Sequence, residues 1–355
     1  MSATNGSAVS FRRLLGCAFV LVLALSAVFA SGASAAKITK SDVALGDSLA
    51  FGYSQQLFNE NEKTGESPSA FLHGYTNDYF NMSHLKLAGG QLQNLGCPGE
   101  TTDSLIGNGP LGAALEGAIP GAHGSAPCAY HNLLGAPLHV EYGAGKSQLE
   151  KALETIAVDS LSGTPATTLT LNIGANDQLA AVHSCEAEVG KEYAETGKSK
   201  YGATPAEAVK HCLEAHLTGL ITHILTNEGA ALFAVRNGAL FGGVNYAGKI
   251  VLQGGYDPYG NVFGTGELLP GSTTLAGVIN TYQSKQATEF GACYANPLPR
   301  FNPGGAKEPA RLQKWTNMAN ATEFEGKKNG PDIHPTPTGY QNLSRIMVTA
   351  CGPGE

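Results

Sequence analysis

A serine follows a short apolar run near the start of the chain, in the segment VALGDSL at residues 43–49. A serine directly after a strand lies at the carboxyl edge of the sheet, where open α/β folds expose reactive groups. Three further segments follow in order: NLGCPGET at 94–101, GAND at 174–177 and DIHP at 332–335. Together the four segments supply a nucleophile, two oxyanion donors and a base, which are the groups that a serine needs to hydrolyse an ester.

The serine and the histidine of these segments have complementary chemistry. The hydroxyl of Ser48 is a poor nucleophile at neutral pH unless a base accepts its proton. His334 is the candidate base, because an imidazole exchanges protons at physiological pH. Asp47 and Asp177, in the same segments, are expected to hold their loops through side-chain to backbone hydrogen bonds. Each segment alone is also typical of an ordinary turn, so the prediction depends on all four occurring in this order.

The four motifs resemble the blocks of the GDSL, or SGNH, hydrolase family of esterases and lipases. The resemblance implies a three-layer α/β/α sandwich with a flavodoxin-like, mostly parallel sheet. It implies that Ser48 is the nucleophile and His334 the base. It also implies an oxyanion hole formed by the backbone N–H groups of Ser48 and Gly99 and the side-chain amide of Asn176. The cysteine content is similar to that of the secreted actinobacterial-type branch of the family.

The last motif departs from the family pattern, which has an acid three residues before the histidine. Here that position is Pro331, and the nearby acid is Asp332, two residues before His334. Either the Asp332 carboxylate contacts the ring, or the backbone carbonyl of Pro331 accepts the ring N–H. Orienting the imidazole is the main task of the third group, so both arrangements are chemically competent. We favour Asp332.

The first 35 residues have the pattern of a secretory signal peptide. Arg12 and Arg13 precede an apolar stretch at 14–30, and small residues at 33–35 form a cleavage site. Residues 36–355 are predicted to form one SGNH hydrolase domain. No later segment approaches the ~20 apolar residues that span a bilayer, so we expect a secreted protein without a stable membrane anchor. The net charge of −7, without a basic cluster, argues against nucleic acid as a partner.

The cysteine pattern indicates disulfides. Of seven cysteines, Cys17 lies in the predicted signal peptide, and an even set remains in an exported chain. Fifteen connectivities are possible. No two cysteines have the CxxC spacing of a zinc site, and we expect neither a metal nor a cofactor. Because each bridge would then close one loop region, we favour the pairs Cys97–Cys128, Cys185–Cys212 and Cys293–Cys351.

Strands alternate with helices along the chain, which favours a mostly parallel sheet covered on both faces. Capping boxes begin two of the predicted helices, at Ser147 with Glu150 and at Thr204 with Glu207. Further helices are predicted around 275–282 and from Pro337. Strands are predicted, from apolar and β-branched runs, at 43–45, 92–95, 167–173 and 249–252. The Gly-, Ala- and Pro-rich stretch 104–145 is interpreted as an irregular excursion, and 186–203 as a solvent-facing loop.

The substrate class is the least determined property. The leading interpretation is a carboxyl-ester hydrolase acting on a small-molecule or lipid ester through an acyl-serine intermediate. An acyltransferase using the same intermediate and an inactive SGNH-like binding module are the alternatives, and the oligomeric state stays open. The stretches 104–145 and 178–203 are candidates for a wall or lid. Aromatic residues after the nucleophile could line an acyl groove, although such clusters more often form core: Phe51, Tyr53, Phe58, Phe71, Tyr75 and Tyr79.

Overall fold

The computed structural model describes residues 40–62, 67–128, 130, 137–319, 323–324, 327–328 and 331–354. The predicted signal peptide, residues 1–35, lies outside the described residues. The described residues fall in one compact unit. Within this part of the chain, no helix combines the length and apolar character needed to cross a membrane.

A five-stranded parallel sheet forms the centre of the molecule, in the order β2-β1-β3-β4-β5. This is the strand order of flavodoxin-like folds, which bind ligands outside the carboxyl ends of their strands. In the register of the central pair, Gly46 at the end of β1 lies opposite Asn172 at the end of β3. The strands are β1 (Ser41–Gly46), β2 (Gln91–Asn94), β3 (Ala166–Asn172), β4 (Lys249–Gln253) and β5 (Cys293–Ala295).

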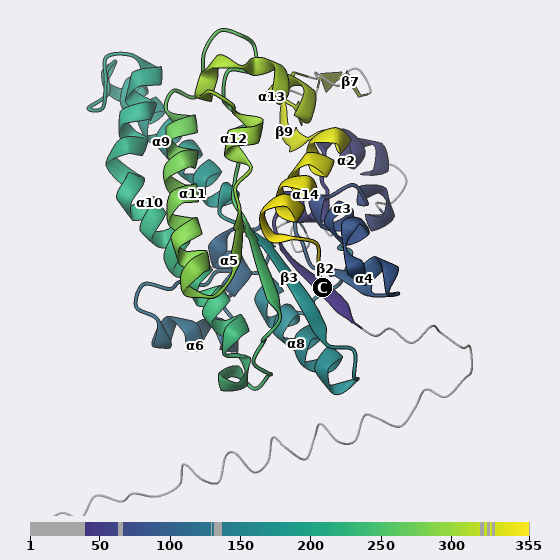
Figure 1. Ribbon diagram of the computed structural model, residues 1–355. Coiled ribbons are helices and arrows are strands. Elements are labelled where there is room, and N and C mark those ends of the chain that lie inside the picture. Colours follow the sequence, from purple (N-terminus) through teal and green to yellow (C-terminus); the bar gives the residue numbers. More distant parts are fainter. Residues whose placement is uncertain are drawn as a thin grey trace, which may run out of the picture. The chain divides into compact units, whose positions relative to one another are not determined.

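Helices cover both faces of the sheet, and β4 shows the alternation that this requires. Ile250 and Leu252 pack into one hydrophobic core, whereas Val251 between them packs into the other. The first core packs against α5 (Thr102–Ile106), α8 (Gln148–Leu161), α10 (Pro205–Arg236) and α11 (Ser272–Glu289). The second packs against α3 (Tyr75–Met82) and α14 (Pro337–Cys351). Figure 1 shows α10 and α11 on one side of the sheet and α3 and α14 on the other. The predicted three-layer α/β/α fold is confirmed.

The described part of the chain also contains short strands and further helices outside the central sheet and the helices named above. Two short antiparallel pairs accompany the sheet, β6 with β9 and β7 with β8. Their bounds are β6 (Thr316–Asn317), β7 (Glu323–Phe324), β8 (Lys327–Lys328) and β9 (Asp332–Pro335). The further helices are α1 (Ser48–Phe51), α2 (Gln55–Glu62), η1 (Pro68–Phe71), α4 (His84–Leu87), α6 (Pro110–Ala118), α9 (Ala175–Thr196), η2 (Gly238–Phe241), α12 (Leu298–Phe301), η3 (Gly305–Lys307) and α13 (Pro309–Trp315).

Both predicted capping boxes are present, and they begin α8 and α10. The loop predicted at 186–203 is wrong in its first half, because α9 continues to Thr196. Towards its C-terminal end this helix needs few apolar residues, since it buries a narrow seam against α10, formed by Cys185, Val189, Ala208 and Cys212. The stretch 104–145 also contains more helix than predicted. A proline begins α6, which buries its two leucines one turn apart.

The six cysteines form the pairs favoured above: Cys97–Cys128, Cys185–Cys212 and Cys293–Cys351. The first bridge ties the loop after β2 to the segment after α6. The second joins α9 to α10, and the third joins β5 to the end of α14. Each therefore links two elements that the chain connects only through a loop or a longer excursion.

Candidate active site

Ser48 lies at the turn between β1 and α1, and it is the first residue of that helix. Asp47 caps the helix, and its Oδ1 accepts the backbone N–H of Leu49 at 2.9 Å, as expected for a loop-holding residue. Gly46 has φ +142°, and an added Cβ would lie 2.4 Å from the carbonyl oxygen of Asn172. Only glycine fits there, because both the backbone conformation and the space exclude a side chain.

His334 lies on β9, which pairs with β6 close to α1. Its Nδ1 is 2.5 Å from Oδ1 of Asp332, and a carboxylate only accepts, so Nδ1 carries the proton. The other oxygen of Asp332 accepts the backbone N–H of Gln55 at 3.0 Å. The Asp332 carboxylate therefore accepts the ring N–H of His334. Pro331, whose backbone carbonyl was the alternative acceptor, is exposed.

The Asp332 carboxylate is ionised in this setting. Burial alone would raise its pKa. The hydrogen bonds and charge of His334 and the N–H of Gln55 outweigh burial, so the pKa of Asp332 lies below its ordinary value. Asp332 therefore presents an ionised carboxylate to the His334 ring.

Ser48, Asn176 and His334 line one cavity at the carboxyl edge of the sheet. Nδ2 of Asn176 donates one hydrogen bond to the carbonyl oxygen of Glu100 at 2.9 Å, which leaves its second N–H available. Among the residues that the structure describes, none accepts the backbone N–H of Ser48 or of Gly99. Gly99 has φ +82° and is exposed beside Glu100. It does not itself line the cavity.

Asp177 is buried beneath this edge and holds the loop that follows Glu100. Its carboxylate accepts the backbone N–H of Thr102 at 3.0 Å and the Thr102 hydroxyl at 2.6 Å. Burial raises the pKa of Asp177. Its observed contacts are those expected for a residue that positions a loop.

Gln148 is a residue of the site that the sequence analysis missed. Its Oε1 accepts the backbone N–H of Gly46 at 2.7 Å, and its Nε2 donates to the carbonyl of the same residue at 2.9 Å. Nε2 also donates to Oε2 of Glu100 at 3.0 Å. This fully buried side chain therefore joins the serine turn to the segment that contains Gly99. In the sequence it is only the first residue of a capped helix, and no local pattern distinguishes it.

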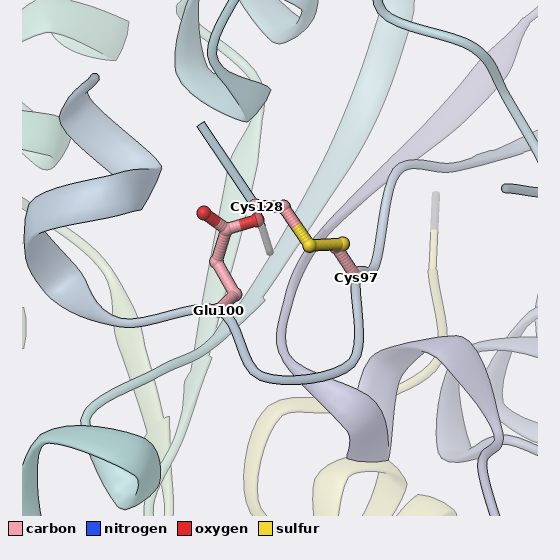
Figure 2. Close-up of side chains that lie close together, drawn as sticks. All are labelled: Cys97, Glu100 and Cys128. Carbon is pink, nitrogen blue, oxygen red and sulfur yellow. A yellow bond between two sulfur atoms is a disulfide. The ribbon is translucent and has the colours of Figure 1, made fainter. Parts of the chain in front are cut away.

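Glu100 lies beside the Cys97–Cys128 disulfide (Figure 2). Burial raises the pKa of Glu100 to about 8, and its Oε1 has no hydrogen-bond partner among the described residues. The side-chain sulfur and oxygen atoms of Cys97, Glu100 and Cys128 lie as close together as the ligand atoms of a metal site. Both sulfur atoms belong to the disulfide, however, and neither can offer a thiolate to a metal. The same holds for the cluster of Glu188, Cys212 and His216, because Cys212 is bridged.

The apolar wall of the cavity comes in part from the start of the stretch 178–203, one of the two candidates for a wall or lid, whereas no described residue of the stretch 104–145 lines the cavity. Leu179 and Val182 of α9 face it, as do Leu275 and Ile279 of α11. Most of the aromatic cluster is core instead, with exposed fractions of 1% or less for Phe51, Phe71, Tyr75 and Tyr79. Of that cluster, Tyr53 reaches the site, and its ring lies edge-on to the His334 ring with centroids 4.8 Å apart.

No family model matches the sequence, and no curated protein sequence is a significant match. Solved structures of similar fold include an extracellular lipase from Streptomyces rimosus, with 16% identity and a TM-score of 0.46 over 88% of this chain and 99% of that one. A variant of an acetyl-xylooligosaccharide esterase from Geobacillus Stearmophilus has 13% identity and a TM-score of 0.41, over 89% and 95%. A carbohydrate acetylesterase family member from Sinorhizobium meliloti has 10% identity and a TM-score of 0.41, over 88% and 96%. At such values the likeness concerns the backbone fold, so the function is argued from this chain's own residues.

Proposed function

We propose that the protein is a secreted carboxyl-ester hydrolase with Ser48 as nucleophile. The observation that carries the proposal is the Asp332–His334 pair, whose histidine lines the same cavity as Ser48 and Asn176. Nucleophile, base and orienting acid come from β1–α1 and β9, far apart in the sequence. Their convergence at the ligand-binding edge of a parallel sheet fits acyl transfer.

In the proposed acylation, Oγ of Ser48 bonds to the carbonyl carbon of the ester while Nε2 of His334 takes the hydroxyl proton. The carbonyl oxygen becomes an oxyanion and accepts hydrogen bonds from the N–H groups of Ser48 and Gly99 and from Nδ2 of Asn176. The tetrahedral intermediate then breaks its bond to the alcohol oxygen, and His334 gives that oxygen the proton.

Deacylation repeats these steps with water. His334 removes a proton from water, the hydroxide attacks the acyl carbon, and the proton returns to Oγ of Ser48 as the acid leaves. Asp332 stays ionised throughout and stabilises the imidazolium form of His334.

Secretion is proposed on two grounds. The first 35 residues have the signal-peptide pattern. Three disulfides are also typical of proteins that fold in an oxidising compartment.

The test of the function is hydrolysis of nitrophenyl esters by the exported protein and by Ser48→Ala. The variant should fold with an unchanged circular dichroism spectrum and lose essentially all turnover. A fluorophosphonate should add to the wild-type protein and leave the variant unlabelled. Turnover above a few per cent in folded Ser48→Ala would refute the assignment.

A further inference from the structure

Two neighbouring cavities lie along α11, and we propose that together they hold the aliphatic chain of a long-chain acyl ester. This inference rests on the function proposed above, because the chain is the one attached to the carbonyl carbon that Ser48 attacks. It adds the substrate class and the elements that select it.

The first cavity begins at Ser48 and has a volume of about 90 Å³. Asn176 begins its α9 wall, and Leu179 and Val182 follow on the same helix at spacings of three residues. Leu275 and Ile279 form the facing wall on α11. Because Asn176 is the side-chain oxyanion donor, a carbonyl group bound there has the apolar wall of α9 directly beside it.

The second cavity lies next to the first, and its volume is about 450 Å³. Leu269, Ser272 and Leu275 line both cavities, so the two share this boundary. Beyond the boundary, the second cavity lies between α10 and α11. Its apolar lining there is Leu213, Leu217, Leu220 and Val278.

The occupant is the acyl chain and not the alcohol, because the reaction fixes the position of the alcohol. The leaving alcohol oxygen has to lie beside His334 on β9, because His334 gives it the proton. In the proposed complex the carbonyl oxygen is bound at Asn176 on α9. The apolar walls of the first cavity extend from α9 and α11, whereas Ile333 and His334 line its other side from β9. A straight hydrocarbon chain also matches a lining of Leu, Val and Ile, and each buried methylene strengthens binding by about fourfold.

The first experiment compares kcat/KM for nitrophenyl acetate, octanoate and palmitate. The wild-type protein should prefer the longer esters, and folded Ser48→Ala should hydrolyse none. Leu275→Trp places a large ring at the shared boundary and should lower the palmitate-to-acetate ratio of kcat/KM by about tenfold or more. Leu217→Trp, in the second cavity alone, should lower the palmitate-to-octanoate ratio.

Leu161→Trp is the matched control. Leu161 ends α8, is 83% exposed and lies near Asp159, which contacts Ser41 at the start of β1. This is the opposite edge of the sheet from Ser48, so neither ratio should change. If Leu275→Trp does not fold by circular dichroism, Leu179→Trp tests the same wall from α9.

The outcomes separate the two proposals. If hydrolysis depends on Ser48 but no cavity variant changes the ratios of kcat/KM between the esters, the proposed acyl path is wrong and the esterase assignment stands. Absence of serine-dependent hydrolysis would overturn both. A crystal structure of the adduct of Ser48 with a dodecyl phosphonate gives a direct view: the alkyl chain should lie between α9 and α11, and a chain lying against Tyr53 and Phe58 instead would refute the path.

Discussion

The side-chain amide of Gln148 pairs with the backbone of Gly46 through two hydrogen bonds, one accepted at 2.7 Å and one donated at 2.9 Å. An amide paired with a peptide group in this way fixes both the position and the orientation of the turn. Ser48 follows two residues later, so the placement of the proposed nucleophile depends on a side chain from α8.

Gln148→Leu should destabilise the protein and lower its turnover. The substitution leaves the N–H of Gly46 and Oε2 of Glu100 without a buried partner, at a cost of about 1–3 kcal/mol per group. The C=O of Gly46 keeps only its hydrogen bond from the backbone N–H of Cys97. Urea unfolding measures the stability, and kcat for a short nitrophenyl ester measures the turnover. Asn237→Leu is a matched control, because that side chain bonds only within its own helical turn. Normal kcat in Gln148→Leu would show that the turn does not need the amide.

Asp332→Asn should reduce kcat by about 10³–10⁴-fold, because a neutral amide does not stabilise the imidazolium and favours the wrong ring tautomer. Binding of substrate should change much less. Pro331→Ala perturbs the adjacent residue while keeping its carbonyl, and it should retain nearly full activity. If Asp332→Asn costs less than about tenfold, a carbonyl group orients the ring and the Asp332 assignment is wrong.

Asn176→Ala should lower kcat by about 10²–10³-fold, the usual effect of deleting one oxyanion donor. KM should change little, since the donor acts on charge that develops in the transition state. Gln178→Ala is the control, because Gln178 also lines the cavity from α9 but donates only to the carbonyl of Gly174. A raised KM with normal kcat in Asn176→Ala would make Asn176 a ground-state contact.

Glu100 predicts a pH dependence of stability. Burial raises its pKa to about 8 in the folded protein, above the ~4.3 of an exposed glutamate. Between these values the folded state retains a proton that the unfolded state releases. The contribution of Glu100 is therefore full below the unfolded value and falls as the pH rises through this window, by at most ~1.4 kcal/mol per pH unit.

Glutamine does not titrate, so Glu100→Gln should flatten the fall in the free energy of unfolding between about pH 5 and pH 8. The variant should match wild type near pH 5 and exceed it near pH 9 in thermal unfolding. Glu289→Gln, at an exposed position of α11, is the control and should leave the profile unchanged. A Glu100→Gln profile parallel to that of wild type would show that Glu100 does not hold the proton.

Features that depend on neighbouring residues were predictable from the sequence. The strand before Ser48, the capped starts of α8 and α10, and the alternation of strands and helices all follow from side chains within a few positions of one another. The order of the motifs then implied the sheet edge at which they meet. The favoured contact between Asp332 and His334 belongs to this class as well, since the two residues are two positions apart on one strand and their side chains share a face.

Only the tertiary structure determined which distant residues support these motifs. Gln148 lies 102 residues from Gly46 in the sequence, and no local pattern identifies it as the partner of that turn. The apolar wall beside Ser48 combines α9 with α11, whereas the aromatic residues next to Ser48 in the sequence are mostly core. Hydrophobic periodicity shows that a helix has an apolar face, but it does not show whether that face meets the core, a neighbouring helix or a cavity. That depends on how the layers pack against one another.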